Sequence, residues 1–269
     1  MEEDATTSPG DYGGQRANME DETMVGTLAA QAAIVWPKER DVLARRAAGA
    51  GGCVLDIACG TGEILRRFRE TFRPDLMVGV DLYRGHLARA EGPVLQGDAH
   101  RLPFVDDTFD LALVRHVLQA IPEPLQLLTE ARRVLRPGGR IHLLVEDYQA
   151  ILFDTDDYDV ANHFVEVSAP FRPKGTDLYQ GRRAFRQLHE AGFSDVQVDP
   201  FVVDTTNSER ETFADVFRNW REGYAATLAG LIGRTEEDLR ARFDAMIETV
   251  RDEKRYTAWL LFVVSGAKG

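Results

Sequence analysis

A glycine-containing turn after an apolar segment is the part of this sequence best suited to hold a ligand. Gly60 and Gly62 follow the segment 54–57, and glycine lets the backbone turn tightly and approach a ligand without a side chain in the way. A helix expected from Glu63 points its free N–H groups into the same space. Asp81 ends the next apolar segment, 19 positions after Gly62, where a carboxylate can accept hydrogen bonds from both hydroxyls of a ribose.

Two classes of nucleoside cofactor fit this turn. A dinucleotide fingerprint requires a third glycine at position 65, which is Leu65 here. S-adenosylmethionine needs no pyrophosphate contact, but it needs a carboxylate near its methionine amine, and Asp56 supplies one. The residues therefore favour S-adenosylmethionine over a nicotinamide dinucleotide.

The elements that position this turn alternate regularly along the chain. Apolar segments of strand length are separated by segments with helical periodicity, which predicts an α/β fold with a doubly wound, Rossmann-like, mostly parallel sheet covered on both faces. The expected strands cover 53–57, 76–80, 94–95, 109–114, 141–145, 196–203 and 257–265, and the expected helices cover 63–70, 85–91, 124–135 (ended by 137–139) and 181–191.

The remaining segments flank or interrupt this core. Residues 1–20 are polar and predict a mobile tail. Residues 27–48 have helical spacing, and Pro37 is expected to split them into two helices or to begin the second. We expect a single domain over 21–269, with a cofactor-binding core at 50–147, an acidic and aromatic lid at 148–180 and a helical insertion at 207–253.

The motifs in this core resemble those of class I S-adenosylmethionine-dependent methyltransferases, especially the small-molecule group that includes ubiquinone- and menaquinone-methylating enzymes. The resemblance runs in order from about 52 to 146, with Ala58 where many members have the first glycine of the turn. The matching segments are 54–63 for the first motif, 79–82 for the ribose motif, 97–104 beside the adenine, and 109–112 with 135–140 for the fourth strand and the turn before the fifth.

The resemblance implies a set of cofactor-binding residues. Asp98 would accept from the adenine amino group, Ala99 would supply a backbone N–H, Leu82 would pack on the adenine face, and Arg115 would lie beneath the sulfonium. The full implied set is Asp56, Ala58, Gly60, Thr61, Gly62, Asp81, Leu82, Asp98, Ala99 and Arg115.

Residues for the methyl acceptor are expected at the carboxyl ends of the strands. His116 directly follows the fourth strand, and Glu146, Asp147 and Tyr148 end the fifth. Together with His163 of the lid, these are the candidate catalytic residues, since a protonated acceptor needs a base; each also has a structural interpretation, as cap, pocket wall or core residue. The remaining histidines, His86, His100, His142 and His189, have no evident special role.

Aromatic side chains are frequent in both insertions. They favour packing over a substrate cage in the lid, and packing over a dimer contact in the helical insertion, where the spacing is roughly helical. The residues are Phe153, Tyr158, Phe164, Phe171 and Tyr179 in the lid, and Phe213, Phe217, Trp220 and Tyr224 in the helical insertion.

Composition and charge limit the classes of partner that this protein is expected to bind. The net charge of −12 argues against a nucleic-acid substrate, and the arginines within 132–140 read as the solvated end of a helix. Cys53 and Cys59 lack zinc or disulfide-framework spacing, and no metal is expected. No apolar stretch approaches the roughly 18 residues of a membrane span, and the acidic start predicts a cytoplasmic protein.

These observations predict an enzyme of the EC 2.1.1 type. It would transfer a methyl group from S-adenosylmethionine to an oxygen or nitrogen of a small organic molecule, with a homodimer as a candidate assembly. Two alternatives stay open at this point: a non-catalytic S-adenosylmethionine-binding module that serves a partner protein, and a nicotinamide-dependent oxidoreductase.

Overall fold

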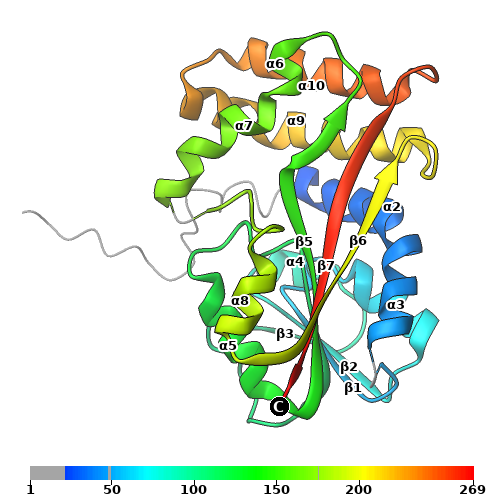
Figure 1. Ribbon diagram of the computed structural model, residues 1–269, viewed down its shortest axis with the longest axis vertical. Helices are drawn as coiled ribbons and strands as arrows, with labels where there is room; N and C mark the ends of the chain where they lie inside the picture. The colour runs from blue at the N-terminus through cyan, green and yellow to red at the C-terminus, as the bar shows by residue number, and fades with distance from the viewer. Residues whose placement is uncertain (1–21, 48–49, 175) are drawn as a thin grey trace, which may run out of the picture.

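The computed structural model describes residues 22–47, 50–174 and 176–269, so the predicted tail lies outside the described residues. In this part of the chain seven strands form one sheet in the order β3-β2-β1-β4-β5-β7-β6 (Figure 1). Every neighbouring pair is parallel except those of β7, which runs antiparallel to β5 and β6. The prediction of a mostly parallel, doubly wound α/β sheet is confirmed. The strands are β1 (Cys53–Ile57), β2 (Leu76–Asp81), β3 (Val94–Gln96), β4 (Phe109–Arg115), β5 (Leu135–Phe153), β6 (Phe193–Asp204) and β7 (Thr257–Lys268).

Helices cover both faces because successive side chains of a buried strand point in opposite directions. Leu55 and Ile57 of β1 pack with two helices on one face, and Val54 packs with two others on the opposite face. The first pair is α5 (Pro124–Val134) and α8 (Ala184–Glu190), the second is α2 (Glu22–Arg46) and α3 (Glu63–Phe72), and a short α4 (Arg84–Leu87) follows β2.

The N-terminal helix is continuous, so the expected break at Pro37 is wrong. A proline inside a helix costs about 3 kcal/mol, because it removes one backbone hydrogen bond and crowds the preceding turn. On both sides of this proline, however, Val35, Trp36 and Leu43 are buried. Packing of these side chains on both sides of the proline stabilises α2 as one helix.

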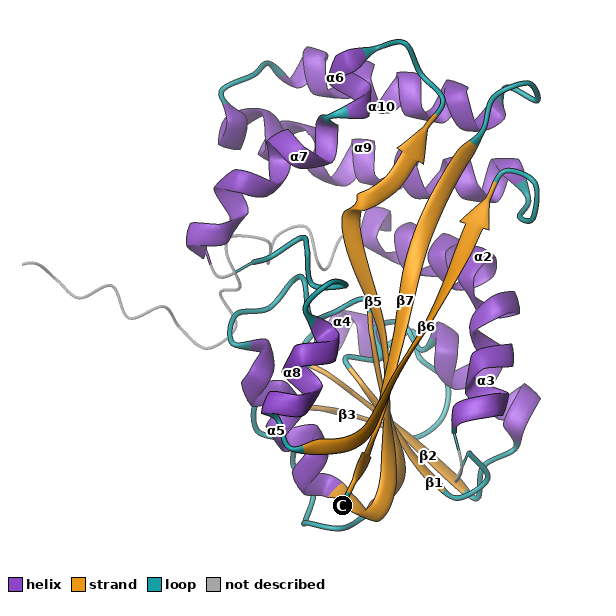
Figure 2. Cartoon of the chain, in the orientation of Figure 1, coloured by secondary structure: helices purple, strands orange, loops and turns teal. Residues whose placement is uncertain are grey.

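The fifth strand is much longer than the expected 141–145, and it includes the Pro-Gly-Gly segment 137–139 that the sequence pattern places at the end of the preceding helix. Beyond the parallel sheet β5 continues beside β7 and β6 toward a group of helices (Figure 2). The β5–β7 register runs to Glu146 opposite Leu261, and it resumes at Ile151 opposite Trp259. The strand is therefore irregular at 147–150, next to the predicted acceptor residues.

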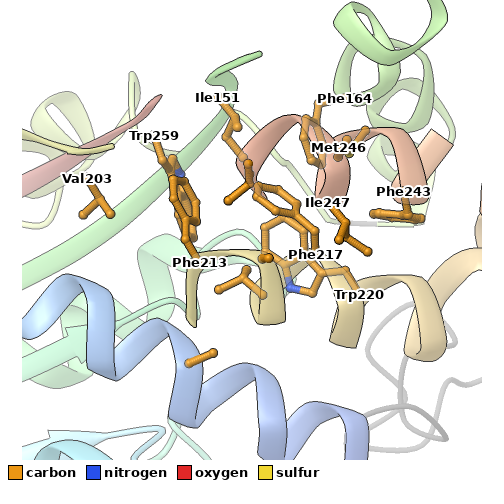
Figure 3. Packing of buried hydrophobic residues seen from close by; sticks show 14 of the residues in the cluster. Ile151, Phe164, Val203, Phe213, Phe217, Trp220, Phe243, Met246, Ile247 and Trp259 are labelled. Atoms are coloured by element: carbon orange, nitrogen blue, oxygen red, sulfur yellow. The ribbon is translucent and has the colours of Figure 1, made fainter. Parts of the chain in front are cut away.

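A helical layer packs on these extended strand ends. Phe213, Phe217 and Trp220 are buried there against Trp259 of β7 and Phe243 (Figure 3), which explains their helical spacing as packing within the chain. None of the described helices combines the length and apolar character needed to cross a membrane. The layer comprises α6 (Tyr158–Ala161), α7 (His163–Ser168), the 3-10 turn η1 (Ala169–Lys174), α9 (Arg210–Ile232) and α10 (Glu236–Arg251).

Candidate active site

Three residues of the glycine turn after β1 have left-handed backbone conformations. Ala58, Gly60 and Gly62 have φ angles of 59°, 56° and 80°. The Gly60 N–H donates to Asp81 Oδ2 at 2.8 Å, which ties the turn to the end of β2. A Cβ at Gly60 would lie 2.9 Å from Leu28 of α2, whereas one at Gly62 would lie 2.8 Å from the Ala90 side chain. Gly60 therefore faces the cavity under α2, and Gly62 allows the turn to pack closely on Ala90, in the segment after α4.

Asp56, near the carboxyl end of β1, is a buried carboxyl group with a shifted pKa. Its side chain is buried, and Oδ2 has no hydrogen-bond partner among the described residues. Burial raises the pKa of Asp56 to about 7, against the lowering effect of Arg115, while the neighbouring Glu39 and Asp81 raise it further. A buried carboxylate that lacks a cation is a site prepared for one, so Asp56 fits the ammonium of S-adenosylmethionine.

Asp81 is anchored at the opposite side of the turn. Besides the Gly60 N–H, it accepts the Tyr83 N–H on Oδ1 at 2.9 Å, and His86 Nδ1 lies 3.7 Å from the same oxygen. Asp81 lines the cavity together with Leu82, so it can still receive ribose hydroxyls through its remaining lone pairs. His86 also lines this cavity, although its sequence context suggests no role.

The predicted adenine segment borders the cavity. Gly97, Ala99 and His100 line the cavity, but Asp98 does not belong to the described lining. Asp98 Oδ1 accepts the His100 N–H at 2.9 Å and lies 3.1 Å from His100 Nδ1. His100 Nε2 is 3.0 Å from the carbonyl of Pro122. The structure thus gives His100 a position beside the expected adenine that the sequence does not indicate.

Arg115 lies at the junction of the two halves of the site, held by a carboxylate that sequence analysis missed. Its Nε and Nη2 donate to Glu39 Oε1 and Oε2 at 2.7 and 2.6 Å, and His142 Nε2 is 3.1 Å from Glu39 Oε1. Burial raises the pKa of Glu39, but Arg115 and His142 outweigh it and bring the pKa to about 2. The signal that could have found it is spacing: Glu39 occupies the same helical stripe as Val35 and Leu43, which are buried.

Two of the predicted acceptor residues, His116 and Tyr148, lie against a third, Glu146, which is fully buried. His116, held at a φ of 53°, places Nδ1 3.0 Å from Glu146 Oε1. The amide of Gln31 donates to the same oxygen at 3.3 Å, and the Gln119 amide donates to Oε2. Tyr148 OH lies 3.5 Å from Oε2, and burial together with Glu146 raises the Tyr148 pKa. These side chains surround the Glu146 carboxyl group, and neither ring nitrogen of His116 has a hydrogen-bond partner within the described residues.

Asp147 points to the other face of β5, because side chains alternate along a strand. It forms an ion pair with Arg182, whose Nη2 donates to Asp147 Oδ1 at 2.8 Å. Asp147 is not part of the described cavity lining. The structure therefore separates it from Glu146 and Tyr148, although the three are adjacent candidates in the sequence.

A cavity of about 210 Å³ joins the two halves, and a smaller one of about 40 Å³ adjoins it at the turn. The small cavity is lined by Asp56 and Thr61 and shares Gly60, Arg115 and His116 with the large one. No group of three or more His, Cys, Asp or Glu side chains in the described ranges is arranged to hold a metal ion. The large cavity is lined at one end by Ala58, Gly60, Asp81, Leu82, Ala99 and Arg115, and at the other by Tyr148, His163, Phe164, Phe171, Trp220, Tyr224 and Phe243.

Comparison with known proteins agrees with this geometry. A family described as "Methyltransferase domain" matches residues 55–143. The chain is 31% identical over 170 residues to the ubiquinone/menaquinone biosynthesis C-methyltransferase UbiE of Paracoccus denitrificans, covering 55% of this chain and 68% of the relative. It is 37% identical over 100 residues to the demethylmenaquinone methyltransferase of Lactiplantibacillus plantarum, covering 33% and 42%. It is also 32% identical over 174 residues to an uncharacterized 37.1 kDa protein in transposon TN4556 of Streptomyces fradiae, covering 61% and 48%.

Solved structures share the fold across more of the chain. The putative methyltransferase in complex with the Trm112 activator of Haloferax volcanii has a TM-score of 0.58 at 18% identity, covering 96% of this chain and 97% of that one. The [4+2]-cyclase SpnF has a TM-score of 0.53 at 20% identity, covering 86% and 80%. At these identities the likeness concerns the fold alone.

The sheet order, the glycine turn with its two carboxylates and the UbiE match together define the class: this chain belongs to the S-adenosylmethionine-dependent methyltransferases. S-adenosylmethionine is the cofactor of that family, and Asp56 Oδ2, which has no partner among the residues that the structure describes, fits its ammonium group. The chain spans about half the length of the first curated relatives it matches, 48% and 42% for the Streptomyces and Lactiplantibacillus proteins.

Proposed function

We propose that this protein transfers a methyl group from S-adenosylmethionine to an oxygen or nitrogen of a small, largely apolar molecule. The observation that carries the proposal is the continuity of the cavity. One end presents the glycine turn, Asp81 and Leu82, and the other presents aromatic side chains. Displacement at a sulfonium methyl group needs the two reactants in line and water excluded, and a continuous apolar cavity supports both requirements.

The residues that hold the cofactor follow from the contacts above. Asp56 pairs with the ammonium, Asp81 receives the ribose hydroxyls, and Ala99 and Leu82 border the adenine. Bound S-adenosylmethionine supplies an electrophilic methyl group. Arg115 lines both cavities, but its charge is neutralised by Glu39, so it shapes the wall between cofactor and acceptor without opposing the sulfonium.

The acceptor's proton is assigned to His116. A hydroxyl or ammonium acceptor must lose a proton as it is methylated, and an imidazole backed by a carboxylate is suited to take it. Glu146, 3.0 Å from His116 Nδ1, stabilises the imidazolium that forms. Tyr148 and Trp220, with ring centroids 5.5 Å apart, provide flat walls for an aromatic or alicyclic acceptor.

The test is transfer of labelled methyl groups from S-adenosylmethionine to a panel of phenols, amines and quinols, followed by location of the label in the product. Two of the relatives are named as a C-methyltransferase of ubiquinone and menaquinone biosynthesis and as a demethylmenaquinone methyltransferase. Label on oxygen or nitrogen supports the proposal, whereas label on ring carbon replaces it with C-methylation. Binding of S-adenosylmethionine without transfer to any acceptor, including cell extract metabolites, contradicts catalysis.

Variants separate the proposed base from its neighbours. Glu146→Gln keeps the size of the side chain but removes the charge behind His116, so we expect kcat to fall by about 10²- to 10⁴-fold. Asp147→Asn is the matched control, because Asp147 is the adjacent carboxylate and lies outside the cavity. Equal losses in the two variants contradict the assignment.

A further inference from the structure

His163 lies in the wall of the acceptor end of the cavity with unsatisfied hydrogen-bonding capacity. Its side chain is fully buried, and neither Nδ1 nor Nε2 has a hydrogen-bond partner within the described part of the chain. The ring is held edge-on between Phe164 and Phe243, at centroid distances of 5.0 and 4.9 Å. Burying an imidazole without hydrogen-bond partners costs free energy. An apolar ring could fill the same space without that cost, so packing alone gives no reason for a histidine at this position.

The charges near His163 are already satisfied by one another. Arg242, buried behind α7, pairs with Glu166 at 2.6 Å and with Asp159 and Asp238 at 3.3 and 3.5 Å. Burial, with Arg242 adding to it, lowers the pKa of His163 to about 3, against the opposing effect of Glu166. The imidazole is therefore neutral at physiological pH, with one N–H donor and one acceptor nitrogen. This makes His163 unsuited to the role of general base.

His163 and His116 are separated by a series of aromatic rings. His116 is 6.3 Å from Trp259, Trp259 is 5.9 Å from Trp220, and Trp220 is 6.0 Å from Phe164, which contacts His163. Figure 3 shows Trp220, Phe164 and Phe243 along this part of the layer. The acceptor end of the cavity thus has polar groups at His116–Glu146 and at His163, with aromatic side chains between.

We infer that His163 hydrogen-bonds a second polar group of the methyl acceptor, so that the acceptor is an aromatic or alicyclic compound with an uncharged hydroxyl or carbonyl far from the methylated atom. A hydroxyl matches the neutral imidazole best, because it can donate a hydrogen bond to the unprotonated ring nitrogen or accept one from the protonated ring nitrogen. A charged group at that end is disfavoured by the apolar surroundings of Phe164 and Phe243. The inference rests on the proposed function and names the substrate class of the same site.

Binding of matched phenols tests this inference independently of turnover. The probes are 4-propylphenol and 4-(3-hydroxypropyl)phenol, titrated calorimetrically into protein saturated with S-adenosylhomocysteine. We expect the hydroxylated phenol to bind about tenfold more tightly, the worth of one neutral hydrogen bond to a buried partner. In His163→Leu the two phenols should bind within about twofold of each other, and His163→Gln should regain part of the preference. Val167→Ala is the control, since Val167 lines the cavity from the same helix and should change both affinities alike.

Thermal unfolding of the ligand-free variants tests whether His163 has a structural role instead. His163→Leu should unfold at the same temperature as the parent protein or higher, because a buried group without partners is removed. The inference is overturned if the parent shows no preference for the hydroxylated phenol, if His163→Leu keeps the preference, or if that variant loses stability. Preferential binding without transfer of labelled methyl contradicts the proposed function but supports the inference on His163. Equal transfer to both phenols supports the proposed function but contradicts the inference on His163.

Discussion

The raised pKa of Asp56 predicts a specific pH dependence of cofactor binding. The ammonium of S-adenosylhomocysteine needs an ionised partner, but in the ligand-free protein Asp56 is half protonated near pH 7, since its pKa is about 7. Below that pH, binding must expel the proton, and the affinity falls about tenfold per pH unit. Between pH 7 and pH 5 the dissociation constant should therefore rise about 50-fold. Above about pH 8 Asp56 is almost fully ionised, so the affinity should level off there.

Calorimetric titration from pH 5 to 8.5 measures this dependence. The matched ligand is 5′-methylthioadenosine, which has the adenosine and sulfur but no amino acid, and whose affinity should stay nearly constant over the same range. Asp56→Asn should weaken S-adenosylhomocysteine binding and remove its pH dependence. A flat profile for the parent protein, or the same slope for both ligands, would show that the Asp56 carboxylate does not bind the ammonium.

Three further predictions concern the stability of the ligand-free protein. Because the pKa of Asp56 is raised from 3.8 to about 7, its ionisation destabilises the folded state progressively over this pH range, so Asp56→Asn should raise the unfolding temperature at pH 8 and leave it nearly unchanged at pH 4. Glu39→Gln leaves the Arg115 guanidinium buried without its partner and should cost about 3–5 kcal/mol in urea unfolding, whereas a loss below 1 kcal/mol would mean that the pair is solvated. In Gly62→Ala the new methyl group meets Ala90 and the backbone has a φ of 80°, so the free energy of unfolding should fall by about 1–3 kcal/mol. In the control Gly230→Ala, in α9, the new methyl group has nothing within 4 Å, so the free energy of unfolding should rise by up to about 1 kcal/mol. Similar effects at both positions would contradict the argument from backbone strain.

The local features of the cofactor turn are encoded by residues that are neighbours in the chain. A strand ending in Asp56, glycines at 60 and 62 and a following helix depend on backbone preferences, which act over short distances. The same holds for the positions of β1, β2 and β4, whose apolar segments are bounded by turns. Sequence spacing is therefore sufficient to place Asp81 and Leu82 beside the turn.

Only the tertiary structure decided which distant groups meet. Glu39 reaches Arg115 across 76 positions, and Gln31 reaches Glu146 across 115. No local preference encodes such pairs, because they exist only when α2 packs over the sheet. The same packing keeps α2 helical through Pro37.

The acceptor end of the site shows the same division. Sequence position correctly identifies His116 as the residue that follows a strand, but it places Glu146 and Tyr148 at a strand end, whereas both lie within β5. Strand alternation alone would have separated Asp147 from Glu146 and Tyr148. The partners of these side chains are not predictable from the sequence, since the length of β5 and its irregularity at 147–150 are set by pairing with β7. Local chemistry thus determined where the cofactor's carboxylates lie, while long-range packing determined which charges are paired, which stay unpaired and which side chains face the acceptor.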